Sequence, residues 1–256
     1  MSRNFELLQN LGKEQVMVNT FAVEQNLPEP VLVTEPQLVV SEPQLKLEPG
    51  EQEQLTKLVQ RVFLLPSADA PRVVVFTASE SGNGCSWVCA RVAETLAAQV
   101  TGPVCLVDAN LRNPGLHYQF GVDNAQGLAD ALRGRQTIRS LARHLSRPNL
   151  WLVSCGSSPE TSLPYLGSER MQQKLAELRN EAEYVLVDAP GMNVSHDAAA
   201  LGAAADGVIV VLKANSSRRE TARKAVQDMQ AGKVRILGAV LNQRTFPIPT
   251  SIYNRL

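Results

Sequence analysis

Three stretches of the sequence place polar groups where a phosphate and a metal ion could bind. The first, "TASESGNGCS" at 77–86, follows the apolar run Val73–Phe76 and contains two glycines. Small residues let backbone N–H groups converge on an anion, and a following helix adds the positive end of its dipole. Ser86 stands where the hydroxyl group of a phosphate-binding loop holds Mg²⁺. Alone this is a weak signal, because any junction between a strand, a turn and a helix favours glycine.

Two aspartates strengthen the prediction of a metal-dependent nucleotide site. Asp108 and Asp188 each follow a continuous apolar run, at 104–107 and 184–187. An aspartate at the carboxyl end of a strand can hold Mg²⁺ through its water shell, although a single one is often only a helix cap. Two of them beside a glycine-bearing loop are less easily explained as caps, and they strengthen the prediction of a site for phosphate and Mg²⁺.

The elements that must position these loops alternate between strands and helices. Strands are predicted at Val73–Phe76, Val104–Val107, Leu150–Val153, Tyr184–Val187, Val208–Leu212 and Ile236–Leu241. Helices are predicted between them, at about 84–99, 127–133, 168–180, 196–205 and 217–230. Apolar strands alternating with helices indicate a parallel sheet covered on both faces. The predicted fold class is therefore α/β, a doubly wound and mostly parallel sheet that binds ligands at the carboxyl ends of its strands.

The sequence divides into four expected segments. A short amphipathic helix at 1–15 is followed by a disordered Glu/Pro-rich tether at 16–51. A P-loop NTPase-like domain then covers 52–245, and a short tail covers 246–256. In the tether, Glu-Pro recurs four times, and recurrent proline blocks helix formation and removes hydrogen-bond donors. The favoured interpretation is a plain spacer. The alternative interpretation makes Leu32, Leu38 and Leu45 docking anchors.

These motifs resemble those of the bacterial tyrosine kinases (BY-kinases) of capsule and exopolysaccharide synthesis, within the MinD/ParA group of P-loop ATPases. The family typically reads "TSxxPGEGKST", "VLLVDADLRRPxLH..FG" and "GLxDxL.G". This chain has "TASESGNGCS", "VCLVDANLRNPGLHYQFG" and "GLADALRG", followed by "YVLVDAPGMNVSHDAAALGAAADGVIVVLKAN" and "ILGAVLN". The resemblance covers residues 52 to about 245 in order, and it implies a P-loop NTPase fold.

The resemblance also implies roles for individual residues. The cofactor-binding loop would cradle phosphates mainly through its backbone, at Ser81, Gly82, Asn83, Gly84, Cys85, Ser86 and Trp87. Asp108, in the Walker A′ motif, would help bind the metal and accept the tyrosine hydroxyl proton. Asp188 would be the Walker B residue, and Asn242 would contact the adenine region. The cofactors would be ATP or ADP with Mg²⁺, with Ser86, Asp108 and Asp188 as the metal-binding residues.

The chain departs from the family pattern where charge matters most. The lysine that neutralises the β- and γ-phosphates is Cys85 here, so the Walker A motif is degenerate, and the extra lysine of MinD-type relatives falls at Glu80. The second Walker A′ aspartate is Asn110, and the tail offers only Tyr253 where the family has a tyrosine cluster. Phosphoryl transfer depends on charge stabilisation, so losing one strong cation can cost ~3 kcal/mol, about a hundredfold in rate.

Three functions follow from these departures. The favoured one is a catalytically impaired regulatory or scaffold member acting in polysaccharide synthesis or export. The alternative is an active ATP-dependent protein tyrosine kinase, in which another basic residue replaces the lysine. The candidates for that residue are Arg112, Lys213, Arg218 and Arg219. The third is a ParA/MinD-like positioning ATPase. The partner implied by the resemblance is a membrane-anchored chain-length or export protein of the Wzz type, and a homo-oligomer is also considered.

Composition limits the remaining classes of function. Basic and acidic residues number 25 each, so no bulk attraction to nucleic acid is expected, and the arginine-rich stretch 133–147 reads as a solvated face. Four cysteines without a framework spacing suit a reducing compartment. No apolar run approaches ~20 residues, and the N-terminus does not resemble a signal peptide. We expect a cytoplasmic protein, peripheral at the inner face of the plasma membrane.

The remaining chemically active side chains are expected to be structural. A helix N-terminus lowers the pKa of a thiol, which makes Cys85 a candidate redox sensor, but a small residue filling a vacated pocket is the favoured interpretation. The three histidines, His117, His144 and His196, are scattered along the chain and are expected to be surface or capping residues.

Overall fold

The structure is a computed structural model, and it describes residues 49–65, 69–134, 136–157 and 159–244. All of them belong to one compact unit, Val40–Leu256. The expected helix at 1–15, nearly all of the expected tether and the expected tail at 246–256 lie outside the described residues. The first described helix begins at Pro49, three residues before the domain start expected at residue 52.

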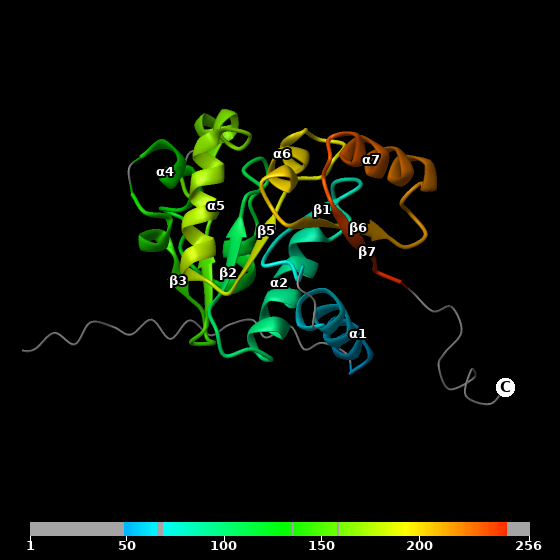
Figure 1. Cartoon of the computed structure of the whole chain (residues 1–256), viewed down its shortest axis with the longest axis horizontal. Coiled ribbons are helices and arrows are strands. Elements are labelled where there is room, and N and C mark those ends of the chain that lie inside the picture. The colour runs from blue at the N-terminus through cyan, green and yellow to red at the C-terminus, as the bar shows by residue number, and fades with distance from the viewer. Residues whose placement is uncertain (1–48, 66–68, 135, 158, 245–256) are drawn as a thin grey trace, which may run out of the picture. The chain divides into compact units, whose positions relative to one another are not determined.

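The described residues form one seven-stranded sheet in the order β3-β4-β2-β5-β1-β6-β7 (Figure 1). Its strands are β1 (Val73–Ala78), β2 (Val104–Asp108), β3 (Arg143–His144), β4 (Leu150–Val153), β5 (Tyr184–Asp188), β6 (Gly207–Lys213) and β7 (Ile236–Asn242). All neighbouring strands are parallel except β3 and β4. The predicted doubly wound, mostly parallel α/β fold is therefore confirmed.

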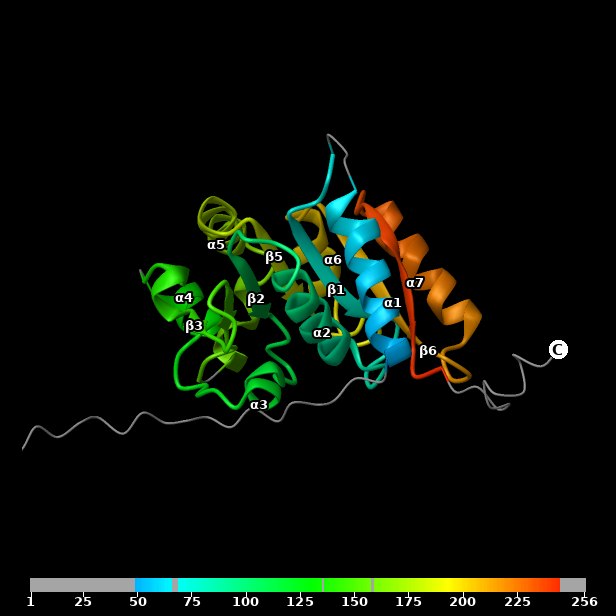
Figure 2. The ribbon, with the colours of Figure 1, turned by 90° about the horizontal axis from the view of Figure 1, so that it is seen from below.

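Helices cover both faces of this sheet. They are α1 (Pro49–Val59), which continues as a π-helical turn, α2 (Cys85–Ala97), α3 (Leu116–Phe120), α4 (Leu128–Arg133), α5 (Glu169–Glu181), α6 (Asp197–Ala203) and α7 (Arg219–Ala231). The helices α1 and α2 lie on one side of the sheet and α5, α6 and α7 on the other (Figures 1 and 2). Two 3₁₀ segments, at Ile138–Leu141 and Pro159–Tyr165, complete the described elements.

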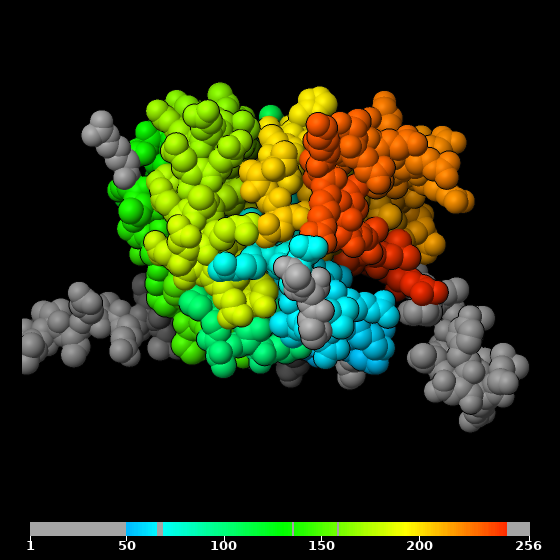
Figure 3. Space-filling model, in the orientation of Figure 1, coloured from blue at the N-terminus to red at the C-terminus, as the bar shows by residue number. Residues whose placement is uncertain are grey.

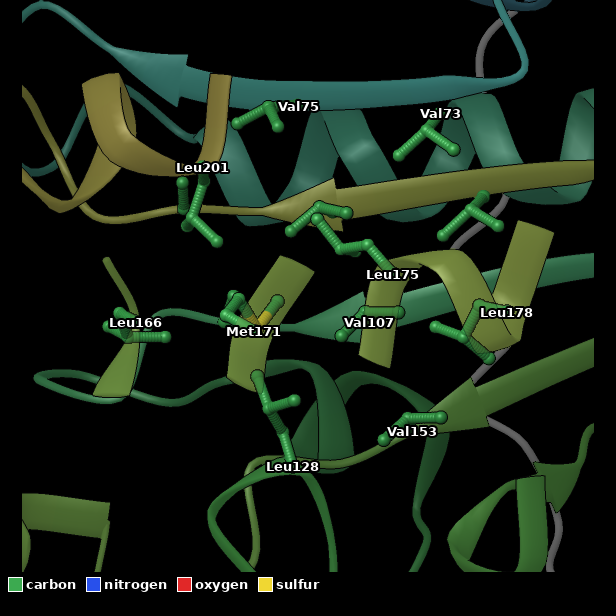
Figure 4. Packing of buried hydrophobic residues seen from close by; sticks show 14 of the residues in the cluster. Val73, Val75, Val107, Leu128, Val153, Leu166, Met171, Leu175, Leu178 and Leu201 are labelled. Atoms are coloured by element: carbon green, nitrogen blue, oxygen red, sulfur yellow. The ribbon is translucent and has the colours of Figure 1, made fainter. Parts of the chain in front are cut away.

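Strand alternation divides the core into two apolar clusters. Successive side chains of a strand point to opposite faces. Val73 and Val75 of β1 accordingly pack in the cluster that α5 covers, whereas Val74 and Phe76 pack in the cluster that α1 and α2 cover. In the first cluster, Leu175 and other α5 side chains point onto the strands (Figure 4). Because both faces are buried, the strands read as continuous apolar runs rather than as alternating ones.

The structure refines two expectations about surface residues. Arg133, Arg143 and Arg147 are exposed, as a solvated face requires, but Arg139 is half-buried and its guanidinium lies 3.4 Å from the ring centroid of Trp151. The expectation for His117 was wrong, because its side chain is buried. The cause is α3, a short helix that the sequence analysis did not predict. Among the described residues, none of the helices has the length and apolar character needed to cross a bilayer.

Candidate phosphate and metal site

The register of the sheet brings the two predicted aspartates together. Asp108 ends β2 and Asp188 ends β5, and they are partner positions of these neighbouring parallel strands. On its other side, Asp188 is the partner of Phe76 in β1, the strand that leads into the glycine-bearing loop. The loops after β1, β2 and β5 therefore meet at one edge of the sheet, where ligands of such folds bind.

Asp188 is the centre of this site, and it is fully buried. The Ser86 hydroxyl group donates a hydrogen bond to its Oδ2 atom over 2.5 Å. The Oδ1 atom is also buried, and it has no hydrogen-bond partner among the described residues. A buried carboxylate oxygen without a donor is costly, and a cation would satisfy it.

Burial changes the protonation of both carboxyl groups. Burial, followed by the nearby Asp108, raises the pKa of Asp188 to about 8, against hydrogen bonds from Ser86 and Cys85. Burial also raises the pKa of Asp108 to about 6, opposed by backbone hydrogen bonds. Asp188 is therefore the member of the pair that holds a proton near neutral pH, when no cation balances the two charges.

Asp108 holds the loop that leads from β2 into α3. Its Oδ2 atom accepts hydrogen bonds from the backbone N–H groups of Gly115 and Leu116, over 3.1 and 3.0 Å. Its Oδ1 atom accepts a bond of 3.3 Å from the N–H group of Asn110. The carboxylate thus performs the structural role of a loop cap at the position where the resemblance implies a base and metal ligand. Those two chemical roles stay predictions.

The loop after β1 has the backbone expected of a phosphate cradle. Gly82 and Gly84 adopt φ angles of +85° and +79°, a region that L side chains rarely adopt. The side chain of Asn83 turns inward and is buried. It donates hydrogen bonds to Ser79 Oγ, Ser217 Oγ and the Val211 carbonyl oxygen, over 3.0, 3.1 and 3.3 Å. Asn83 therefore fixes the loop to β6 and to the segment before α7.

The structure also brings Asn242 to this loop. Its Nδ2 atom donates a hydrogen bond of 3.0 Å to the Asn83 carbonyl oxygen. A Cβ atom placed on Gly84 would lie 2.4 Å from the same nitrogen, so a side chain there would push the Asn242 amide away from the loop. Asn242 is thus a packing partner of the loop, and its implied contact with adenine stays a prediction.

The other predicted loop residues differ in their surroundings. Cys85 is buried, and burial, followed by the nearby Asp188, raises the pKa of its thiol well above the ordinary value. Trp87 is half-buried and packs against the apolar cluster of α1 and α2. Ser81 is exposed, and its N–H group donates a hydrogen bond of 3.2 Å to Asn193 Oδ1. A thiol that stays protonated does not support a redox sensor at Cys85.

Replacement cations for the missing lysine are limited among the described residues. Arg112 is held by Asp197, with 3.1 Å between Nε and Oδ2. Arg218 and Arg219 are exposed where α7 begins. Lys213 ends β6 as the partner position of Asn242 in β7, which places it at the loop's edge of the sheet.

Several residues of the site were missed by the sequence analysis. Ser79 and Ser217 receive the Asn83 side chain, and Thr77 Oγ1 donates a 2.7 Å hydrogen bond to the Pro190 carbonyl oxygen. Asn193 accepts the bond from Ser81. Their signal in the sequence was modest, namely small polar residues in loops after strands, which describes most loops of this fold class.

The residues present fit a nucleotide with Mg²⁺. Ser86, Asp188 and Asp108 supply hydroxyl and carboxylate oxygens, which are the ligands that Mg²⁺ prefers. The Oδ1 atom of Asp188 is an independent indication of such a site, because it is buried without a hydrogen-bond donor among the described residues. A bound cation or its water shell would take the place of that donor. The loop glycines supply a backbone that can approach phosphate closely.

No protein-family model matches the chain. Among curated proteins, it is 32% identical to EpsB of Ralstonia solanacearum over 172 residues, which are 66% of this chain and 22% of EpsB. It is 29% identical to the tyrosine-protein kinase YwqD of Bacillus subtilis over 169 residues, 66% of this chain and 71% of YwqD. This chain therefore spans about a fifth of EpsB and most of YwqD.

Solved structures share the fold. The chimerical protein CapA2B2 superposes with a TM-score of 0.72 at 23% identity, covering 78% of this chain and 87% of that one. A ParA family ATPase from Chlorobium tepidum superposes with a TM-score of 0.58 at 20% identity, covering 67% and 74%. The curated homologues of this chain are bacterial tyrosine-protein kinases, and its fold is the one that their kinase domains share with ParA-type ATPases.

Proposed function

We propose that this chain is a catalytically impaired member of the bacterial tyrosine-kinase family, kept for binding and regulation. The observation that carries the proposal is the pairing of Cys85 with Asp188. Where the family pattern has a lysine, an uncharged thiol lies buried beside a buried carboxyl group. The loop therefore presents no cation at the position where the transferred phosphoryl group needs one.

The energetic consequence of this replacement falls mainly on turnover. Phosphoryl transfer relies on positioning and on charge stabilisation, so loss of one strong electrostatic contact costs ~3 kcal/mol, about a hundredfold in rate. The backbone cradle at Gly82 and Gly84 does not depend on the lysine. Binding of ATP or ADP can thus persist when transfer is slow.

When bound, Mg²⁺ would neutralise charge on the phosphates of the nucleotide. Ser86 and Asp188 would hold the ion, with Asp108 beside them. Ser86 already lies in hydrogen-bonding contact with Asp188, so the two ligands are oriented together. Asp188 has to lose its proton for this role, which makes binding of the ion dependent on pH.

The biological setting follows from the resemblance to kinases of capsule and exopolysaccharide synthesis. In this setting the chain acts in polysaccharide synthesis or export, as a peripheral protein at the inner face of the plasma membrane. Its partner there is a membrane-anchored protein of the Wzz type. The matched relatives include chains far longer than this one, such as EpsB, of which only 22% is matched.

One observation favours a second function, an active tyrosine kinase. Lys213 pairs in register with Asn242, whose amide contacts the loop through the Asn83 carbonyl oxygen. This places one basic residue at the same edge as the candidate phosphate cradle. In this second function, Lys213 supplies the missing cation.

Calorimetry on two matched variants tests the proposal. We expect the wild type to bind ATP with Mg²⁺ weakly but measurably, and Cys85→Lys to bind it at least about tenfold more tightly. Cys85→Met is the control, because it adds a side chain of similar length without charge, and it should not tighten binding.

Phosphorylation assays separate the two functions. Micromolar binding with transfer to tyrosine in the wild type, lost in Lys213→Ala and in Asp108→Asn, would establish the active kinase and overturn the impaired one. Binding without transfer, with transfer appearing only in Cys85→Lys, is the outcome that the proposal predicts.

A further inference from the structure

A cleft of about 290 Å³ lies outside the loop described above, between α6 and α7. Met192 and Met229 line it with thioether groups, and Lys224, Asp228 and His196 line it with polar ones. Ser79 is the residue that this α6–α7 cleft shares with the loop at 77–86. Methionine side chains adapt their shape to different apolar partners, so such a lining suits an extended segment with apolar side chains.

The start of α7 beside this cleft is strongly basic. We call the exposed side chains of Arg218, Arg219, Arg223 and Lys224 the basic face. Glu220 lies among them and Asp228 one turn further along, so cations outnumber anions two to one. None of the ion pairs found among the described residues includes a member of the basic face. Part of α7 (orange) is open on the visible surface in the space-filling view (Figure 3).

The opposite charge is concentrated elsewhere in the sequence. Residues 1–48 contain seven glutamates and three basic residues, a net charge of −4, in a chain whose total is zero. The stretch from Glu29 to Glu48 carries four glutamates, three of them followed by proline within the stretch, and apolar residues between them. Prolines favour an extended backbone that loses little entropy on binding. The sequence thus supplies an acidic, proline-rich segment with apolar side chains that could act as anchors.

We propose that the basic face and the α6–α7 cleft bind the Glu-Pro stretch, 29–48, of a second copy of this chain. The glutamates pair with the basic face, and the leucine and valine side chains enter the methionine-lined cleft. Each copy carries one acidic stretch and one basic face, so the contact can repeat from copy to copy. This gives the Glu-Pro repeat a docking role, the alternative to the plain spacer.

Charge reversal on the full-length chain tests the contact. The face variant carries Arg223→Glu with Lys224→Glu, and the stretch variant carries Glu29→Lys, Glu35→Lys and Glu42→Lys. In sedimentation velocity, we expect the wild type to self-associate more weakly as salt rises. Each variant alone should associate at least about tenfold more weakly, since like charges then face one another. An equimolar mixture of the two should recover association, because each variant then meets its opposite charge.

The matched control reverses two exposed arginines outside the cleft and the basic face, Arg143→Glu with Arg147→Glu, and it should associate as the wild type does. Circular dichroism on each variant confirms the fold, and the exposure of all the substituted described side chains favours folding. A wild type that stays monomeric at about 100 μM overturns the proposal. So does a mixture that stays dissociated, which would be the result if each stretch bound within its own copy or bound nothing.

Discussion

Asp108 and Asp188 occupy partner positions at the carboxyl ends of β2 and β5, and both carboxyl groups are fully buried. Parallel register at this edge forces two acidic side chains into the same low-dielectric region. Among the described residues, backbone N–H groups around Asp108 offset part of the cost of burying the two charges, as do the Ser86 hydroxyl and the Cys85 thiol beside Asp188. Burial of the pair therefore destabilises the cation-free protein, and a bound cation would offset this cost.

The first prediction concerns the pH dependence of stability. The pKa of Asp188 is raised in the folded chain, so the stability it contributes is fully present below its unfolded value, about 4. This contribution is lost as pH rises through the folded value of about 8. Asp188→Asn should therefore raise the free energy of unfolding at pH 8 by on the order of 1–3 kcal/mol, and by much less at pH 5.

Urea unfolding of the metal-free protein between pH 5 and pH 9 checks this expectation. Asp228→Asn removes an exposed carboxylate on α7 and serves as the control, with a profile like that of the wild type. If the wild type and Asp188→Asn have parallel pH profiles, Asp188 does not hold its proton near neutral pH.

The second prediction concerns the two loop glycines with positive φ. Gly82→Ala should cost about 1 kcal/mol of stability, because its φ of +85° is strained for alanine while no atom lies within 4 Å of the added Cβ atom. Gly84→Ala should cost roughly 1 kcal/mol more, because the same strain is joined by a clash with Asn242 Nδ2.

Thermal unfolding of both variants measures the difference between them. In the Asn242→Ala background, the Cβ atom added at Gly84 no longer meets the Asn242 amide. Gly84→Ala and Gly82→Ala should then lower the free energy of unfolding by similar amounts. An unchanged difference in that background would show that Asn242 does not pack on the loop.

Sequence patterns predicted the frame of this site better than its contacts. Continuous apolar runs identify buried parallel strands, so β2 and β5, and the aspartates that end them, were predictable. The strand β3 has only two residues, too few for any periodicity, and α3 is a five-residue helix held partly by Asp108. The inward turn of the Asn83 side chain was not predictable either, because two of its three partners, Val211 and Ser217, come from distant parts of the chain. Local patterns carry no information about such partners.

The third prediction concerns thiol reactivity. The chain has four cysteines, and all of them are buried. Burial raises the pKa values of Cys105 and Cys155 to about 12, and those of Cys85 and Cys89 well above the ordinary value. Because the thiolate is the reactive form, iodoacetamide at pH 8 should label the native protein at least ~100-fold more slowly than the denatured one.

Mass spectrometry locates the labelled residues in both states. Four labels per chain in urea are the internal control. Fast labelling of Cys85 alone in the native protein would instead support the redox sensor that the start of α2 makes conceivable.

The last prediction concerns the coupling between the loop and α7. The Asn83 side chain joins Ser79 to Ser217, which precedes α7, and Ser217 Oγ also accepts a 2.9 Å hydrogen bond from the Lys213 N–H group. Asn83→Ala removes three hydrogen bonds at once, two of them buried, and leaves the Val211 carbonyl oxygen without this donor. We expect a loss of about 1–3 kcal/mol in the free energy of unfolding.

A double-mutant cycle with Ser217→Ala separates the shared contact from the rest. The two substitutions should be non-additive by about 0.5–1.5 kcal/mol, since each removes the same Asn83–Ser217 bond. Thr221→Ala is the matched control, because it shortens a hydroxyl side chain of α7 that has no hydrogen bond to Asn83 among those found in the described residues. Additive losses for Asn83 and Ser217 would mean that the loop and the start of α7 move independently. Non-additive losses would mean that the Asn83–Ser217 bond couples the loop energetically to the start of α7.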